Sequence, residues 1–360
     1  MLLPMATVTV LMPVYNADRY LGSAIESILR QTFKEFEFLI INDASTDRSG
    51  KIMGSFSDNR IRVVENETNL GLAQTLNRGI QLAKGEFIAR QDADDLSHPE
   101  RLERQVAFLR ARPGTGLVGT QALIIDESGR YKRILRHRPH DHVAIKWDLL
   151  FDNSFVHTSV MFRNKIVRDT LGGYDPSYVA CEDYELWSRV AEVCHVANLP
   201  SSLVLHRLHS ASKREGTEES VKIQDLARVI TRNAEAMFGK EFLSESESAL
   251  LAQFSFGYRD RSSAAQFVEL FDRLVAEYLR ICPEAVVSRD FKQAVSGIYF
   301  RLFYNAWKTK VFPPAWCFLR QPGWIRIASM LLFSHCMRSI SRGRRRREKS
   351  GLHVRGTGTW

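Results

Sequence analysis

The chain has 360 residues, 44% of them hydrophobic and 25% charged, and a formal net charge of +9 at pH 7. This length and apolar content are enough to bury a sizeable core and suggest about two domains. Its five cysteines are scattered, include no Cys-x-x-Cys pair and are odd in number. They argue against a disulfide framework and against a zinc site, and they fit a reducing compartment.

The first residues favour a buried strand over a targeting segment. Residues 1–15 are apolar but carry no basic segment and no small-residue cleavage site, so we expect no signal peptide. The β-branched run Thr7–Met12 instead predicts a buried strand that ends at Pro13. An amphipathic helix is expected next, with Asn16 or Asp18 as its cap.

Strands and helices alternate through the first 90 residues. Further strands are predicted at Phe36–Ile41, Ile61–Val64 and Phe87–Ala89, with a helix at Leu72–Ala83 before the last of them. Such alternation implies an α/β fold, Rossmann-like, in which a mostly parallel central sheet is covered by helices on both faces. In sheets of this kind ligands bind outside the carboxyl ends of the strands.

One strand end is acidic. The segment Arg90–Asp95 holds three carboxylates within four residues, Asp92, Asp94 and Asp95. Carboxylates this close repel one another unless a positive charge lies among them. An Asp-x-Asp sequence at a strand end can hold Mg2+ or Mn2+ and leave coordination positions for water and a substrate diphosphate. The other interpretation is a solvated turn rich in aspartate, which is common at strand ends.

The segment Gly114–Gly119 fits the Gly-x-Gly-x-x-Gly fingerprint of dinucleotide-binding proteins. It follows a predicted helix, Pro99–Leu109, and leads into a predicted strand, Leu117–Ile125. The fingerprint requires the opposite order, with a strand before the glycines and a helix after them. We therefore interpret the segment as a turn and do not predict a Rossmann dehydrogenase.

Four further elements are predicted downstream. They are a loop over the site at Tyr131–Asp141, a helix at Val143–Phe151, a strand at Thr158–Phe162 and a turn at Leu171–Asp175. The paired glycines of that turn permit the close approach of a substrate.

Four motifs occur in a fixed order along the first part of the chain: Pro13–Asn16, Asn42–Asp47, Asn69–Gly71 with Asn77 and Gly79, and Gln91–Asp95. In this order and spacing they resemble the nucleotide-binding half of the family 2 glycosyltransferases, which are inverting enzymes of the GT-A fold. The resemblance covers roughly residues 5–212, and four ordered motifs are far more specific than any one of them.

The resemblance implies a nucleotide-sugar site formed by Pro13, Tyr15, Asn16, Asp43, Asn69, Arg90, Asp92, Ala93 and Asp94. Asp43 would accept a hydrogen bond from a uracil-like imide N–H, because a carboxylate at a strand end can read a base edge. Asp92 is assigned to the ribose side, and Asp94 to a metal, Mn2+ or Mg2+, that bridges both phosphates. Asp95 can serve either role. Arg90 either neutralises the diphosphate or forms a plain salt bridge with the acidic cluster.

A second acidic segment, Cys181–Trp187, also matches the family. Inverting transfer needs a base that takes the proton from the incoming hydroxyl, and the matching position is Asp183. The competing interpretation is that Glu182 and Asp183 only stabilise a helix start, where the helix dipole favours carboxylates. The resemblance places the following residues near the acceptor or in supporting positions: Asp95, Gly173, Tyr174, Glu182, Trp187 and Arg207.

The segment His206–Ser212 resembles the basic stretch that closes over the diphosphate in this family. His209 can complete the coordination of a metal together with Asp94, or it can be a structural histidine. Arg207 can contact phosphate or acceptor, and His206 is expected to be structural.

The rest of the chain changes character. We expect a GT-A catalytic domain at residues 1–214, a helical region at 215–300 and a basic segment at 301–360. Residues 301–360 hold 13 Lys and Arg against a single acid, a net charge of +12, so the first 300 residues carry −3. Its tryptophans and cations suit an interfacial anchor on anionic lipid, because its apolar run is far below the roughly 20 residues that span a bilayer. Nucleic-acid binding by Arg342–Arg347 is the alternative, and residues 351–360 fit a disordered end.

These features together predict an inverting, metal-dependent glycosyltransferase that moves a sugar from a nucleotide-diphosphate sugar, with UDP favoured, to a hydroxyl of a lipid-linked saccharide or polysaccharide. We expect a peripheral protein on the cytoplasmic face of the cell membrane, and nucleic acid is not an expected partner. One alternative is a nucleotidyltransferase of related fold, but Pro13–Asn16 replaces the Gly-rich basic loop of such enzymes. The other is a noncatalytic protein that binds nucleotide-sugars or nucleic acid.

Overall fold

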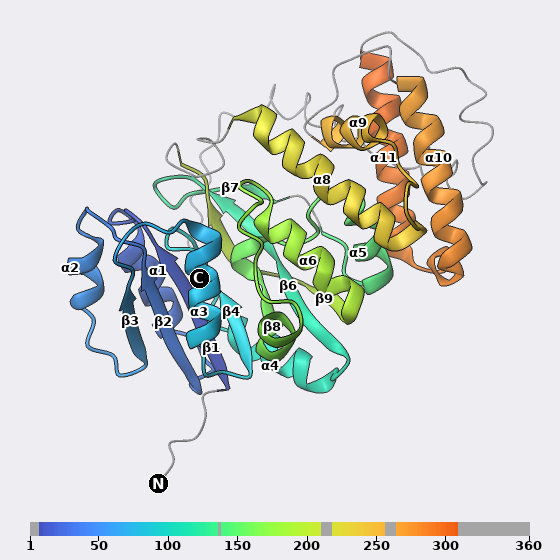
Figure 1. Ribbon diagram of the computed structural model, residues 1–360. Helices are drawn as coiled ribbons and strands as arrows, with labels where there is room; N and C mark the ends of the chain where they lie inside the picture. Colours follow the sequence, from blue (N-terminus) through green and yellow to red (C-terminus); the bar gives the residue numbers. More distant parts are fainter. Residues whose placement is uncertain (1–6, 136–137, 210–217, 256–263, 309–360) are drawn as a thin grey trace, which may run out of the picture. The chain divides into compact units, whose positions relative to one another are not determined.

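The computed structural model describes residues 7–135, 138–209, 218–255 and 264–308 (Figure 1). Contacts divide the chain into two compact units, the first ending at Ala252 and the second starting at Gln253. Within the described residues the first unit contains a nine-stranded sheet. Its strands are β1 (Val8–Val14), β2 (Phe36–Asn42), β3 (Ile61–Glu65), β4 (Phe87–Arg90), β5 (Leu96–Ser97), β6 (Thr115–Ile125), β7 (Tyr131–Ile134), β8 (Met161–Arg163) and β9 (His195–Arg207).

Helices connect most of these strands and make up the described part of the second unit. Those of the first unit are α1 (Leu21–Leu29), α2 (Ser49–Gly54), α3 (Leu72–Leu82), α4 (Arg101–Ala111), α5 (His142–Asp148), α6 (Glu182–Val193) and α8 (Glu219–Phe238). Two irregular turns, the 3-10 turn His157–Ser159 and the π-helical turn Ile166–Thr170, flank β8. Helix α9 (Glu245–Ser255) runs across the division, and α10 (Ala264–Ile281) and α11 (Arg289–Lys308) follow it in the second unit.

The sheet is parallel in its first half and mixed in its second. The strand order is β3-β2-β1-β4-β8-β6-β9-β5, with β7 paired to β6. Strand β1 is parallel to β2 and β4, and β2 is parallel to β3, which confirms the parallel arrangement predicted for these four strands. Strand β8 then runs antiparallel to both β4 and β6. The amino end of β8 therefore lies at the edge where β1, β2 and β4 have their carboxyl ends.

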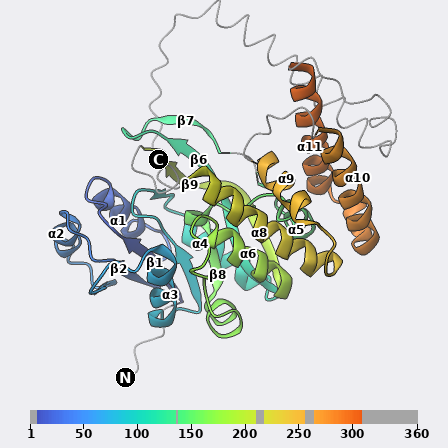
Figure 2. The ribbon, with the colours of Figure 1, turned by 45° about the horizontal axis from the view of Figure 1, so that its top comes forward.

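Both faces of the parallel half are covered, as the alternation of side chains in a strand requires. Val10 of β1 belongs to a core cluster with Ile25 of α1 and Leu102 of α4. The next residue, Leu11, faces α3, where a Cβ at Gly79 would lie 2.3 Å from a Leu11 methyl carbon. Helices α1 and α3 thus lie on opposite faces of the sheet (Figure 2).

Three strands, the two-residue β5, β7 and β9, lie where none was predicted. The segment Tyr131–Asp141, expected as a loop, begins with β7, and all four residues of β7 are exposed. Because neither face of β7 is buried, its sequence shows no alternation of apolar and polar residues that could predict a strand. Strand β9 extends over 13 residues with a proline inside it and shifts its register against β6. The predicted strand Thr158–Phe162 is shorter than expected, because the 3-10 turn precedes β8.

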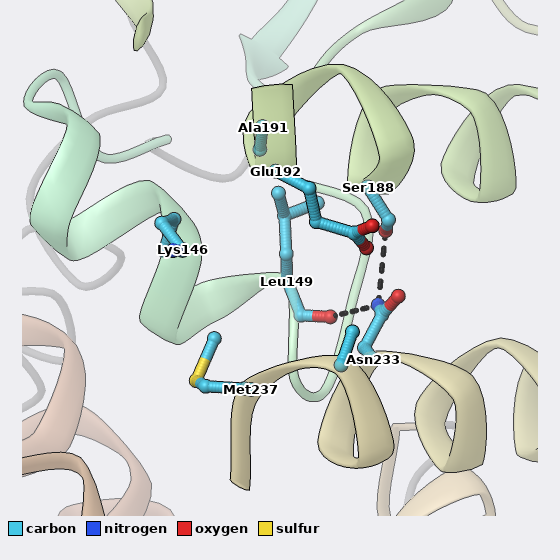
Figure 3. A pocket seen from close by; sticks show the side chains of 8 residues that line it. Lys146, Leu149, Ser188, Ala191, Glu192, Asn233 and Met237 are labelled. Atoms are coloured by element: carbon cyan, nitrogen blue, oxygen red, sulfur yellow. Dashed lines mark hydrogen bonds between the residues drawn. The ribbon is translucent and has the colours of Figure 1, made fainter. Parts of the chain in front are cut away.

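Helix α8 belongs to the first unit, which therefore extends past the boundary that we expected at residue 214. The amide of Asn233 on α8 donates to the carbonyl of Leu149, at 2.6 Å, and to the hydroxyl of Ser188 on α6, at 2.9 Å (Figure 3). These two bonds cross a cavity between α5, α6 and α8 that Lys146 and Met237 also line. The cavity holds no acidic cluster, and its polar atoms tie α8 to the sheet-bearing part of the unit.

The second unit is helical where it is described. The ring of Tyr278 on α10 stacks on that of Phe291 on α11, with the centroids 5.4 Å apart. None of the helices among the described residues has the length and hydropathy needed to cross a bilayer. The basic segment expected at residues 301–360 lies outside the described residues from residue 309 onward.

Candidate active site

Segments distant in the sequence meet at one edge of the sheet. Residues 15–16, 43–47 and 91–95 follow β1, β2 and β4, whose carboxyl ends coincide because the strands are parallel. The 3-10 turn before β8 joins them, since the backbone N–H of Asp92 donates to the Thr158 hydroxyl at 3.0 Å. The end of strand β9 lies at the same edge, because β9 pairs antiparallel with β5 and places Leu205 opposite Leu96. The motifs predicted to form one site therefore do lie together.

The three carboxylates of the acidic turn lie close together but differ in their partners. One oxygen of each lies within 4.8 Å of the others. Asp95 is fully buried, where it accepts a hydrogen bond from the Arg207 N–H at 2.7 Å and faces His206 Nδ1 at 3.0 Å. The side chain of Asp94 is 31% exposed, and its Oδ2 lies 2.8 Å from His209 Nε2. Asp94 and His209 are thus the pair that can share an external ligand, whereas Asp95 and His206 hold the turn.

Buried arginines support this turn from within the protein. Arg90 forms an ion pair with Asp92, and its side chain is 2% exposed. Arg101, fully buried on α4, donates to the carbonyl of Arg90 at 2.7 Å and to the Gln91 side chain at 2.9 Å. Of the two possibilities raised for Arg90, the structure contains the salt bridge. Its positive charge offsets part of the repulsion among the three carboxylates.

Arg207 also faces inward. Its Nε donates to the carbonyl of Asp94 at 2.9 Å, and its Nη1 donates to the carbonyl of Asp126 at 3.1 Å. The guanidinium carbon lies 4.5 Å from the centre of the Tyr20 ring, and the residue is 5% exposed. The guanidinium of Arg207 is thus engaged by the carbonyls that shape the acidic turn, and its predicted contact with phosphate or acceptor stays a prediction.

The proton affinities of the turn reflect this crowding. Burial and the neighbouring carboxylates of Asp95 and Asp92 raise the pKa of Asp94 to about 6. The charge of Asp95 raises the pKa of His206 to about 9, against the opposing effect of burial. A carboxyl with a raised pKa is destabilised in its charged form, and a bound cation would relieve that destabilisation.

The residues predicted to bind the nucleotide gather at the ends of β1 and β2. Asp43 is 3% exposed and accepts hydrogen bonds from the Asn66 amide at 2.6 Å and from the N–H groups of Leu70 and Gly71, at 2.8 and 3.0 Å. The other members adopt supporting or open positions. Pro13 lies inside β1, where it pairs with Ile41, and so does not end the strand. The Asn16 side chain accepts a hydrogen bond from the Thr46 N–H at 2.9 Å, and the Asn69 side chain accepts one from the Gly71 N–H at 3.1 Å. Tyr15 is 53% exposed, whereas Ala93 is buried.

Asn16 and Asp18 do not cap α1, contrary to the prediction. The residue before that helix is Tyr20, and no side chain caps it. Asn16 instead adopts a positive φ of 48° and bridges to the segment after β2, while Asp18 pairs with Arg48. The two residues thus tie the β1 and β2 loops together.

Asp183 opens α6 with its carboxylate held on two sides. Its Oδ2 accepts from the Asn153 amide at 2.8 Å, and its Oδ1 accepts from the N–H of Tyr184 at 2.7 Å. The side chain remains 20% exposed, whereas the adjacent Glu182 is buried. A partly exposed carboxylate with a fixed orientation can accept a proton from a bound hydroxyl.

The Gly173 turn packs closely against the Asn77 side chain of α3. Gly173 has a φ of 91°, and a Cβ there would lie 2.3 Å from the Asn77 side-chain oxygen. Asn77, on α3, accepts from the Tyr174 N–H at 2.7 Å and donates to the Tyr174 carbonyl at 2.8 Å. Arg189 of α6 donates to the Gly173 carbonyl at 2.7 Å. The close approach that this glycine permits in the structure is that of the Asn77 side chain, and the predicted approach of a substrate stays a prediction.

Trp187 and Tyr174 are buried aromatic residues that pack against each other beside Asp183 and the Gly173 turn. Trp187 is fully buried on α6 and lies 5.9 Å from the Tyr174 ring and 5.7 Å from the Phe162 ring, measured between centroids. Tyr174 is 3% exposed. Both residues therefore support their neighbours and do not present a surface to an acceptor.

Sequence reasoning missed four residues of the site: Asn77, Arg101, Asn153 and His157. Asn77 stood in a motif but received no role, and Arg101 stood at a predicted helix start. Asn153 and His157 belong to a polar stretch between a predicted helix and a predicted strand. A polar stretch before a strand becomes a signal only when that strand is known to run antiparallel to the others.

Comparison with known proteins agrees with this geometry. The glycosyl transferase family 2 model matches residues 9–171. EpsE of Bacillus subtilis is 41% identical over 191 residues, which are 51% of this chain and 66% of that protein, just under two thirds of its length. WbnJ of Escherichia coli, an O-antigen biosynthesis glycosyltransferase, is 32% identical over 58% of this chain and 82% of its own length. The chain belongs to glycosyltransferase family 2.

A solved structure extends the comparison to the fold. The crystal structure of Staphylococcus aureus TarS residues 1–349 in complex with UDP-GlcNAc superimposes with a TM-score of 0.56. It covers 91% of this chain and 92% of that one at 16% sequence identity. At this identity the likeness concerns the fold alone, which is the GT-A fold of the family.

Proposed function

We propose that the protein transfers a sugar, with inversion, from a nucleotide-diphosphate sugar to a hydroxyl of a saccharide acceptor. The observation that carries this proposal is the partly exposed carboxylate of Asp183, held by Asn153 and the Tyr184 N–H. A UDP-sugar is the favoured donor, since TarS is in complex with UDP-GlcNAc. A lipid-linked saccharide or polysaccharide is the favoured acceptor, since WbnJ belongs to O-antigen biosynthesis.

The Asp94–His209 pair suits a divalent cation. A carboxylate oxygen and an imidazole nitrogen 2.8 Å apart can both face one ion, and Asp95 is withdrawn from it by its own partners. Oxygen donors fit Mg2+ and Mn2+, and the imidazole favours Mn2+. When bound, the ion would stabilise the negative charge on the departing diphosphate.

The chain's own residues supply the remaining steps. The β1 and β2 loops around Asp43 hold the nucleotide, and the exposed ring of Tyr15 offers a face for the base. Asp183 accepts the proton of the acceptor hydroxyl as its oxygen attacks the anomeric carbon opposite the diphosphate. Because one attack occurs from the opposite face, the anomeric configuration is inverted.

A screen of nucleotide-sugars for thermal stabilisation, with and without Mn2+, tests this function. We expect one UDP-sugar to raise the melting temperature in the presence of Mn2+, by an amount that grows with the logarithm of its concentration. Transfer to a saccharide acceptor should then give a product of inverted configuration. Stabilisation by a nucleoside triphosphate together with pyrophosphate release would instead identify a nucleotidyltransferase, and binding without transfer would identify a noncatalytic protein.

We further propose peripheral attachment to the cytoplasmic face of the membrane through the basic segment 301–360. The net charge of +12 on this segment favours anionic lipid. Ending the chain at residue 308 keeps α11 and should release the protein from anionic vesicles, whereas salt should weaken binding of the intact chain by screening. Sedimentation with neutral vesicles is the control. Binding that persists in the shortened chain, or tight binding to RNA without binding to vesicles, contradicts the proposal.

A further inference from the structure

Asp183 lies at one end of a chain of polar contacts that no step described so far uses. His157 Nδ1 lies 3.9 Å from Asp183 Oδ2, and His157 Nε2 lies 2.9 Å from the Tyr174 hydroxyl. The order is thus carboxylate, imidazole, phenol. The imidazole comes from the turn before β8, the phenol from the Gly173 turn and the carboxylate from α6, so three separate elements converge on these contacts.

The neighbouring rings fix the geometry of the imidazole. The centroid of the His157 ring lies 6.0 Å from that of Trp187 and 5.7 Å from that of Tyr174. The side chain of His157 is only 14% exposed. Tyr174 is fixed in turn, because Asn77 of α3 bonds to both its backbone N–H and its carbonyl. The imidazole therefore has little freedom to turn its nitrogens elsewhere.

The position of the proton on the imidazole follows from its partners. Burial raises the pKa of Tyr174 well above its usual value, so the phenol keeps its proton. When this proton is donated to Nε2, the other nitrogen of a neutral ring carries the hydrogen. A doubly protonated ring also carries a hydrogen on Nδ1. The remaining tautomer would direct the Nδ1 lone pair at a carboxylate, which sets two acceptors against each other.

We propose that His157 is a positioning residue that orients the carboxylate of Asp183 through its Nδ1–H, and that Tyr174 fixes the required tautomer. Together with Asn153, the imidazole places two N–H groups on the side of Oδ2, while the Tyr184 N–H donates to Oδ1, so the orientation of the carboxylate is set from both sides. The distance of 3.9 Å between His157 Nδ1 and Asp183 Oδ2 is longer than a hydrogen bond, so in this structure the imidazole N–H attracts the carboxylate electrostatically. This inference rests on the proposed role of Asp183 as the base.

Two substitutions of His157 distinguish the contribution of its Nδ1 from that of its Nε2. In His157→Asn the amide replaces the Nδ1 end and keeps a donor toward Asp183. In His157→Gln the amide reaches the Nε2 end and keeps the contact with Tyr174, but the donor toward Asp183 is lost. We expect His157→Gln to lower kcat by about 10- to 100-fold, as misplacement of a reacting group does, and His157→Asn to retain most of the turnover. KM for the donor and the melting temperature should be similar in both variants.

Tyr174→Phe completes the test, because it keeps the ring against Trp187 and removes only the hydroxyl. It should also lower kcat, and the double variant Tyr174→Phe/His157→Gln should be no slower than His157→Gln alone, since both changes act through one contact. His142→Gln is the matched control. His142 is a partly buried imidazole next to His195, 4.8 Å between ring centroids, and its loss should leave kcat unchanged.

Three outcomes overturn the inference: wild-type kcat in His157→Gln, equal loss of kcat and of melting temperature in His157→Asn and His157→Gln, or additive losses in the double variant. These outcomes are separate from failure of the proposed function. If Asp183→Asn is inactive while His157→Gln is normal, only the role of His157 fails. If Asp183→Asn retains full turnover, the base itself has been misassigned and the inference falls with it.

Discussion

Replacing Asp183 with Asn is expected to lower turnover by about 10²–10⁴-fold, the contribution that a general base usually makes. Asparagine keeps the shape of the side chain but cannot accept the proton of the attacking hydroxyl. Because the Asn153 amide and the Tyr184 N–H that hold the Asp183 carboxylate belong to neither the β1 loop nor the β2 loop, we expect donor affinity and metal affinity to stay near the wild-type values. Single-turnover kinetics with the donor found in the nucleotide-sugar screen measures the effect on chemistry directly.

Glu192→Gln is the matched control for Asp183→Asn. Glu192 is also a carboxylate of α6, but it lies at the other end of the helix, where it pairs with Arg232. Its neutralisation should leave turnover unchanged. Near wild-type turnover in Asp183→Asn, in an assay limited by chemistry, would reject the assignment. A product that keeps the anomeric configuration of the donor would reject inversion and, with it, the need for a single base on the acceptor side.

The parallel half of the site could be predicted because its signals are local. Apolar runs such as Phe36–Ile41 end in polar residues, and parallel strands place all such ends at one edge. Asp43 and Asp94 were therefore recognisable as site candidates, whereas Asp183 was identified from the family resemblance; the 2.8 Å contact between Asp94 and His209 brings together two residues 115 positions apart. Order along the chain was sufficient here, because each motif follows its own strand.

The antiparallel half could not be predicted in the same way. His157 and Asn153 precede β8, and a residue before a strand reaches the site only if that strand runs against its neighbours. Nothing in the three residues of β8 indicates their direction. Direction is decided by pairing with β4 and β6, which are distant in the sequence.

The orientation of the arginines is a third kind of information that the sequence lacks. Arg90 and Arg207 stand beside the expected diphosphate site, so contact with phosphate was a reasonable expectation for both. The structure buries both side chains under the acidic turn instead. Three carboxylates packed at a strand end require positive charge and hydrogen-bond donors from the protein interior to offset their repulsion. Arg90 and Arg207 supply these, although in the sequence they resemble phosphate ligands.

Replacing Asp94 with Ala is expected to abolish the Mn2+-dependent part of UDP binding while the fold stays intact. Among the described residues, no backbone N–H or arginine donates to the Asp94 carboxylate, whereas Asp95 is held by the Arg207 N–H and Asp92 by Arg90, so neither can replace Asp94 at His209. Burial and like charges raise the pKa of Asp94 to about 6, which means that its ionised form is destabilised in the folded protein. A group with a raised carboxyl pKa weakens the fold as the pH rises through that value, so its removal should not lower the melting temperature of the metal-free protein at neutral pH.

Calorimetry of UDP binding with and without Mn2+ measures the metal-dependent part, and Asp169→Ala is the control. Asp169 is an exposed acid that pairs with Arg168 on the π-helical turn, so its loss should change neither UDP affinity nor its response to Mn2+. His209→Ala distinguishes a ligand from a simple hydrogen-bond partner, because loss of an imidazole ligand should weaken binding with Mn2+ more than with Mg2+. Equal metal-dependent affinity in wild type and Asp94→Ala would place the cation elsewhere, and Asp92, tied to Arg90, would then be the remaining carboxylate of the cluster with an exposed surface.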